Sequence, residues 1–243
     1  MKLIVIVAAL VVTCFLITHI TSSQEQGKVK QEKKAVLNES ELTQKQKAHR
    51  KFLKTSLGPK LRDLAAHGIG DVLVSVEDPF IISTTAETQR LPTIQTTVCN
   101  ADAIVVGTLK SESPQLTEDE SFLFTEYIMS VSDVIKNNAA ADIQSSADIT
   151  VIREGGIGLI NGRTIRAERE GFKLFTVGNQ YLLFLRYIPE TGAYLAYPYG
   201  SFELIQDQIL PFGKMPEGSS TNKASFLNAV RATADAGGCV KQH

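Results

Sequence analysis

The sequence has little of what metal centres and covalent catalysis usually need. It contains no tryptophan, and its 243 residues include only three cysteines, three methionines and four histidines. No group of His, Cys and Asp has metal-site spacing, no G-x-S-x-G elbow is present, and no glycine-rich loop ends in GK[ST]. We therefore predict no metal, no cofactor and no catalytic residue, although an exported hydrolase with residues scattered among loops stays open as an alternative.

The net charge of the chain is close to zero. The formal net charge is −1 at pH 7, which gives no general attraction to nucleic acid. Residues 24–60 carry ten Lys and Arg against four Asp and Glu, whereas residues 61–243 carry fourteen against twenty-two. A basic arm therefore precedes an acidic body, and we expect that body not to bind nucleic acid.

Residues 1–23 have the composition of a signal peptide or anchor. Lys2 precedes an apolar run over residues 3–18, and small residues follow at 21–23. The run is shorter than the roughly 20 residues that a membrane-spanning helix needs, so we prefer a cleaved secretory signal to an uncleaved anchor. On this interpretation the chain is exported to a periplasmic or extracellular space and contacts a membrane only through its N-terminal segment.

We expect residues 24–70 to form a basic linker and a helical stalk. Asn38 and Glu41 have the spacing of a capping box, which predicts a helix over about residues 39–57. Gly58-Pro59 ends this helix, and PKLRDLAAHG predicts a second short helix with Pro59 at its first position and Gly68 at its end. Because the first helix has few apolar residues, we interpret it as solvated rather than as inserted into a membrane.

Residues 71–243 change to short apolar runs rich in β-branched and aromatic residues, which predict a mainly β domain. These runs are DVLVSV, FIIS, DAIVVGTL, LFTEYIMSVSDVI, DITVI, FKLFTV, YLLFLRYI, AYLAYP and SFELI. The clearest hairpin turns at residues 189–192, and a C-terminal helix is expected to begin at Asn222 or Ser225 and to end near Ala234. Strands at this spacing suggest a closed barrel or a sandwich.

Removal of the signal leaves two cysteines, Cys99 and Cys239. A pair of cysteines in an exported chain suggests one disulfide, which would join the start of the β domain to its C-terminal tail. The alternative is two unrelated thiols. We do not expect Cys99 to be catalytic, because His49 and His67 precede the β domain and His243 ends the chain.

The stretch CNADAIVVGTLKS, residues 99–111, is similar to the opening of the netrin-like module found in tissue inhibitors of metalloproteinases. Two later stretches resemble that module as well: SVSDVIK at 130–136 and GNQYLLFL at 178–185. The resemblance covers roughly residues 99–202. It implies a small closed OB-like barrel with an appended C-terminal helix, and a first cysteine bonded toward the far end of the module, which suits Cys99 with Cys239.

The chain also departs from that family. Inhibition there uses a free N-terminal cysteine whose amino and carbonyl groups chelate the protease zinc, whereas Cys99 lies deep in this chain. The family's dense cysteine framework is missing too. The resemblance therefore implies the fold and not the activity, and a metalloprotease inhibitor remains an alternative only if the chain is processed just before Cys99.

Aromatic residues concentrate around the predicted hairpin, and in OB folds such residues can form a binding platform. Strand alternation should nevertheless turn half of them into the barrel. We place the binding surface on this hairpin and on residues 155–162, interpreted as a mobile glycine-rich loop flanked by arginines. The residues expected there are Tyr181, Tyr187, Tyr194, Tyr197, Tyr199, Arg163 and Arg166.

The sequence thus predicts an exported, non-enzymatic binding domain stabilised by one disulfide. Its expected partner is another protein, with a saccharide as the second choice.

Overall fold

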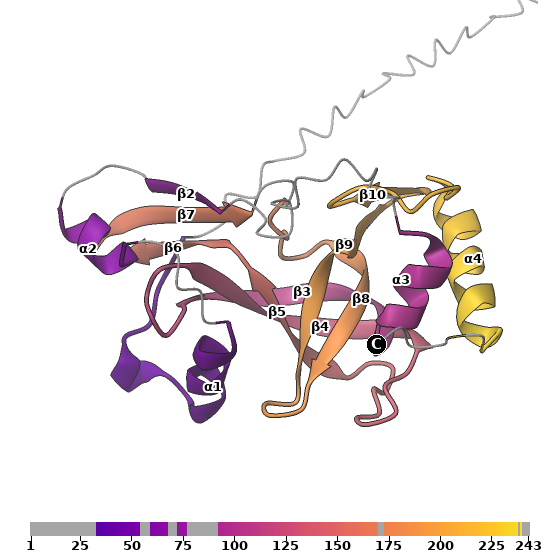
Figure 1. Ribbon diagram of the computed structural model, residues 1–243, viewed down its shortest axis with the longest axis horizontal. Coiled ribbons are helices and arrows are strands. Elements are labelled where there is room, and N and C mark those ends of the chain that lie inside the picture. The colour runs from indigo at the N-terminus through magenta and orange to yellow at the C-terminus, as the bar shows by residue number, and fades with distance from the viewer. Residues whose placement is uncertain are drawn as a thin grey trace, which may run out of the picture. The chain divides into compact units, whose positions relative to one another are not determined.

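Five long strands form a closed ring in the computed structural model of the chain (Figure 1). The structure describes residues 33–53, 59–67, 72–76, 92–169, 173–237 and 239. Around the ring each strand hydrogen-bonds to the next, and the last returns to the first. The order is β3 (Ala103–Leu116), β4 (Leu123–Lys136), β5 (Asp148–Glu154), β9 (Ala193–Ile205) and β8 (Gln180–Ile188).

A short parallel pairing closes the ring. β5 and β9 meet through Val151 opposite Tyr194 and Ile152 opposite Leu195, whereas the other four pairings of the ring are antiparallel. Buried side chains from all five strands form one cluster, here called the inner cluster, which includes Val105, Met129, Val151, Leu183 and Ala196. The ring therefore encloses its own hydrophobic core, and the predicted mainly β class is confirmed.

The long hairpin of β3 and β4 carries the curvature that closure needs. Its register shifts at three places, between Ile104 and Val105, between Val106 and Gly107, and between Leu109 and Ser111. Such bulges bend a strand and increase its twist. Gly107 also permits a close approach, because a Cβ there would lie 2.4 Å from the carbonyl oxygen of Ser130.

A second, smaller sheet has the order β1 (Lys34–Ala35), β6 (Gly156–Ile160), β7 (Arg163–Arg169) and β2 (Val72–Val76). Its buried side chains, with Leu61 and Ala65 of helix α2 (Leu61–Ala66), pack on Leu116, Phe122 and Leu123 at one end of the β3–β4 hairpin. Gly158 brings β1 close to β6, because a Cβ at this position would lie 2.6 Å from a methyl carbon of Val36.

Two helices cover the opposite part of the ring. Helices α3 (Ile94–Asn100) and α4 (Lys223–Asp235) contribute Val98, Phe226 and Val230 to a cluster with Ile104, Phe184 and Phe202, and strand β10 (Gln208–Pro211) adds Ile209. The Asn222 side chain accepts a hydrogen bond from the Ser225 backbone and begins α4. The predicted C-terminal helix is therefore confirmed, with Asn222 as its cap.

The predicted disulfide is also confirmed. Cys99, near the end of α3, is bonded to Cys239, which follows α4, and their Cα atoms are 4.9 Å apart. The bond ties together the two helices that cover the ring.

Several local expectations are corrected. Residues 155–162, expected to be a mobile loop, contain strand β6 and a tight turn into β7, while residues 173–177 of the predicted strand FKLFTV form a loop. The N-terminal helix predicted over residues 39–57 is split into a 3₁₀ turn (Glu39–Glu41) and helix α1 (Gln44–Phe52). Thr43 begins α1 by exchanging hydrogen bonds with Gln46, a second capping box one turn later.

The segment that we interpreted as a solvated stalk is packed on the strands. Residues Glu32–His243 form one compact unit, and His49 and Arg50 of α1 are buried. Few apolar residues made this helix look solvated, but its burial is largely polar.

Some expectations concern residues outside the described ranges, namely the signal or anchor at 1–23, the linker before residue 33 and the run FIIS. Among the residues that are described, no helix combines the length and apolar character needed to cross a membrane.

The disulfide should contribute strongly to stability. Because it spans 140 residues of sequence, removing it by Cys99→Ala with Cys239→Ala should lower the free energy of unfolding by about 4–5 kcal/mol in the chain-entropy treatment, or less. Urea unfolding followed by circular dichroism measures this change. The reduced wild-type chain should match the double variant, which itself should not respond to reductant; an unchanged unfolding midpoint would contradict the expectation.

Candidate interaction face

The structure does not place the expected binding residues on one exposed surface. Tyr181 and Tyr194 are buried in the inner cluster and cannot belong to an exposed platform, because strand alternation turns both into the ring. Tyr187 is half-buried and contacts Tyr194, with ring centroids 5.2 Å apart, whereas Tyr199 is 42% exposed. The side chain of Tyr197 lies outside the described part.

The expected arginines lie elsewhere. Arg163 and Arg166 belong to β7 of the smaller sheet, and Arg166 donates through Nε to a Glu168 carboxylate oxygen at 2.7 Å. Arg166 is therefore engaged by an acid on its own strand.

Among the described residues, the largest fully buried side chain is an arginine that sequence reasoning did not predict as a site residue. Arg153 of β5 is 1% exposed, and its guanidinium carbon lies 4.1 Å from the centre of the Phe175 ring and 4.9 Å from that of Phe212. Burial lowers the pKa of Arg153 to about 9, which still leaves it protonated at neutral pH. A cation between aromatic faces is stabilised by the ring quadrupoles.

Two tyrosines complete this aromatic box. Burial raises the pKa of Tyr181 to about 12 and also raises that of Tyr127, so both hydroxyls are neutral. The Tyr181 hydroxyl accepts from the Thr176 backbone N–H at 2.8 Å. Phe175 and Phe212 come from segments outside the five strands of the ring, so the box fastens these segments to the ring and has a structural role.

A different part of the ring is in contact with helix α1. We call the outer face the surface formed by Phe124 and Glu126 of β4, Ile152 of β5, Ile188 of β8, and Ala193 and Leu195 of β9. These residues alternate with those of the inner cluster along their strands and therefore point out of the ring. Leu53, at the end of α1, packs into this apolar cluster.

A buried polar pair lies between α1 and the outer face. Nδ1 of His49 is 2.6 Å from a carboxylate oxygen of Glu126, and the side chains are 2% and 10% exposed. Nε2 of His49 is buried without a hydrogen-bond partner. The contact gives the Glu126 carboxylate a hydrogen-bond partner but leaves the second imidazole nitrogen of His49 without one, so the hydrogen bonding of this buried pair is incomplete.

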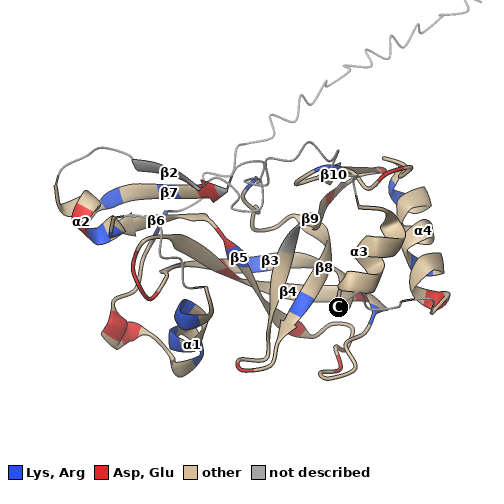
Figure 2. Cartoon of the chain, viewed as in Figure 1, with Lys and Arg blue, Asp and Glu red and all other residues tan. Residues whose placement is uncertain are grey.

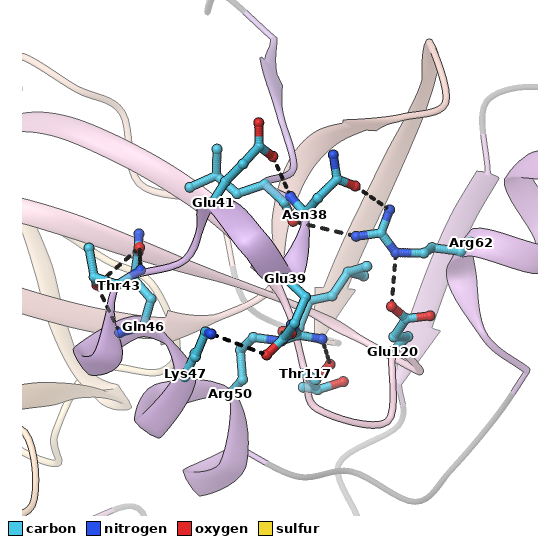
Figure 3. A network of polar contacts seen from close by, with 12 residues as sticks. Asn38, Glu39, Glu41, Thr43, Gln46, Lys47, Arg50, Arg62, Thr117 and Glu120 are labelled. Atoms are coloured by element: carbon cyan, nitrogen blue, oxygen red, sulfur yellow. Dashed lines mark hydrogen bonds and ion pairs between the residues drawn. The ribbon is translucent and has the colours of Figure 1, made fainter.

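Arg50 clamps α1 to the end of β3. Its Nε donates to the Leu116 carbonyl at 2.8 Å and its Nη2 to the Thr117 carbonyl at 3.2 Å, while its Nη1 is paired with Glu39. In the reverse direction, the Glu118 backbone N–H donates to the Arg50 carbonyl at 3.1 Å. Figure 3 shows Arg50 in a network with Glu39 and Thr117.

The segment around α2 holds the turn that joins β3 to β4 from its other side. Nε of Arg62 donates to Glu120 at 2.8 Å (Figure 3). The Leu61 backbone N–H donates to the Glu120 carbonyl at 2.8 Å. Within the turn, Asp119 accepts from the Thr117 hydroxyl at 2.6 Å and from the Ser121 backbone. Although burial opposes it, these hydrogen bonds lower the pKa of Asp119. This acidic turn is therefore occupied by protein contacts.

The other clusters of polar groups give weaker evidence for a functional site. No set of three or more His, Cys, Asp or Glu side chains is placed to hold a metal within the described residues. A shallow open hollow of about 370 Å³ lies beside α4 and is lined by Asp207, Lys223, Asn228 and Arg231, among others. Arg231 is paired with Asp133, and Lys223 donates to Gln180 at 3.2 Å, so both cations are engaged.

The outer face is therefore a buried surface on which α1 packs, and sequence reasoning missed it. Phe124, Glu126 and Ile152 lie in two runs that were correctly predicted as strands, but ring closure decides which of their faces points outward. The Thr43–Gln46 spacing was the available signal for the true start of α1.

The aromatic box can be tested with two substitutions of Arg153. Arg153→Ala should lower the free energy of unfolding by about 2–4 kcal/mol, because it leaves a cavity between two rings. Arg153→Met fills that space without a charge to desolvate and should stay within about 1 kcal/mol of wild type. Urea unfolding at pH 7 measures both, and equal losses would show that the charge matters more than the volume.

The Arg50 clamp can be tested against its neighbour. Arg50→Ala should lower stability by about 1.5–3 kcal/mol, because it removes charge-assisted hydrogen bonds to two carbonyl groups. Lys51→Ala is the matched control, since Lys51 is exposed, and it should change stability by less than about 0.5 kcal/mol. Hydrogen exchange of the α1 amides should accelerate only in the first variant, and equal behaviour of the two would contradict the clamp.

Comparisons with known proteins do not assign the chain to a family. No protein-family model matches the sequence, and no curated protein is significantly similar to it. Its function is therefore inferred from its own residues.

Proposed function

We propose that the chain is an exported, non-enzymatic binding domain built on an OB-like barrel of the netrin-like kind. The observation that carries the proposal is the strand order of the ring. If β3, β4, β5, β8 and β9 are counted as strands one to five, the ring runs one, two, three, five, four, and strands three and five are parallel. The OB fold is a five-stranded Greek-key barrel, so this strand order supports the proposal.

The disulfide supports the netrin-like part of the proposal. Cys99 stands just before the first strand of the ring, and its partner Cys239 follows the C-terminal helix. In netrin-like modules the first cysteine is bonded toward the far end of the module. Because disulfides persist in oxidising compartments, the bond also supports export, with any membrane contact made through the N-terminal segment.

The fold suggests where a partner binds. OB domains bind ligands on the face of strands two and three and at the loops joining strands one to two and four to five. In this chain those elements are β4 and β5, the turn after β3, and the β8–β9 turn at residues 189–192. At that last turn Arg186 and Glu190 are exposed and Tyr187 is half-buried, a mixture that suits a protein partner better than a saccharide.

Metalloprotease inhibition gains no support from the geometry around Cys99. It would require a free amino group at this residue, but Cys99 follows the fully buried Val98 inside α3. Cleavage between them would break the helix that packs against α4, so we do not propose inhibition.

The proposal predicts a specific contact at the β8–β9 turn. A photo-crosslinking amino acid at the exposed position Glu190 should give one protein adduct in cells that express the chain naturally. The same group at the exposed position Ala232 of α4 is the matched control and should give none.

Competition and glycan digestion complete this experiment. Excess unlabelled wild-type protein should abolish the adduct, and a saccharide partner would give a product sensitive to glycosidase instead. Identical adducts from positions 190 and 232, or no adduct of either kind from position 190, would contradict the proposed function.

A further inference from the structure

We propose that the outer face binds a short basic helix of a partner protein, and that α1 is a displaceable resident ligand of the same chemistry. The partner helix would carry an arginine beside a histidine-like donor and a leucine four residues after that donor, as His49, Arg50 and Leu53 do. This inference rests on the proposed function, because it names the partner's chemistry for the same fold.

The location of α1 is the first argument. Leu53 packs with Phe124 and Ile152 on strands β4 and β5 and with Ile188 beside the β8–β9 turn, and Arg50 binds the end of β3 and the turn that follows. The helix therefore covers the face of strands two and three together with both loops at which OB domains bind ligands.

Charge complementarity is the second argument. The outer face offers the Glu126 carboxylate to His49, and the adjoining end of β3 with its turn offers the carbonyl groups of Leu116 and Thr117 to Arg50. All of these groups accept hydrogen bonds, so the face selects a donor-rich, positively charged helix. In Figure 2 basic residues are marked along the ribbon of α1, and acidic residues are marked just before it in the 3₁₀ turn.

The third argument is that α1 is short and makes few apolar contacts with the outer face. The helix has only nine residues, and an isolated helix of this length is unstable in water. Among the described residues at α1, only Leu53 belongs to the apolar cluster of the outer face. His49 has a buried nitrogen without a hydrogen-bond partner, and Phe52 is 43% exposed. A partner helix that satisfies the same acceptors more completely can therefore replace α1.

The test uses the full chain and a peptide of its own sequence. Arg50→Glu combined with Leu53→Asp should release α1 while leaving every residue of the outer face unchanged. A fluorescein-labelled peptide of residues 38–53 should then bind this variant saturably and at least tenfold more tightly than it binds wild type, in which α1 competes. A matched peptide with Arg50→Glu should not bind, and Glu126→Gln in the released variant should weaken binding of the native peptide.

Equal binding of the peptide to wild type and variant, or no binding to a variant that keeps its disulfide and its cooperative unfolding, would overturn the inference. Should the double variant fail to fold, hydrogen exchange of the wild-type chain decides. The α1 amides must then exchange faster than those of β4 and β5, and exchange only upon global unfolding would make α1 a permanent part of the core.

Two further outcomes separate the possible occupants. A concentration-dependent dimer of wild type that the peptide dissociates would make a second copy the occupant and overturn the assignment to another protein. An adduct from position 190 without peptide binding would leave the proposed function standing and remove only this inference.

Discussion

The parallel contact between β5 and β9 is the constraint on which the rest of the structure depends. Only two residue pairs make it, yet they convert a sheet into a ring with a protected interior. Because side chains alternate along a strand, the same closure sends Val151 inward and Ile152 outward. The buried core and the outer face are thus two consequences of one pairing, and the outer face exists only while β5 stays beside β9.

Helix α1 packs on the outer face rather than standing apart from it. Its contacts are mostly polar: an arginine on carbonyl groups, a histidine on a carboxylate, and a single leucine in an apolar patch. Such an interface is specific in geometry, and apart from the charge-assisted hydrogen bonds of Arg50 its polar contacts contribute little net stability, because they replace contacts with water. A covering helix held in this way suits the proposed binding function, in which a partner would compete for the same acceptors.

Much of the fold could be predicted from the sequence, and the failures have physical causes. The strands of the ring, the β8–β9 hairpin, the C-terminal helix cap and the disulfide all depend on local pattern or on cysteine count. The position of Arg153 could not be predicted, because a charged residue inside a closed ring of strands contradicts composition rules and becomes stable only between Phe175 and Phe212. Tyr181 and Tyr194 were placed on the surface because their direction depends on ring closure, a long-range property.

The contact of Leu53 with the outer face tests the central claim most directly. Methyl-labelled NOE spectroscopy of the intact, oxidised chain measures it without any substitution. We expect NOEs from the Leu53 methyl groups to those of the outer-face cluster, at Ile152 and Ile188, together with NOEs between Val151 and Tyr194 across the closing pair. NOEs across the closing pair without any from Leu53 would mean that the ring forms but α1 does not cover it, which would contradict the account.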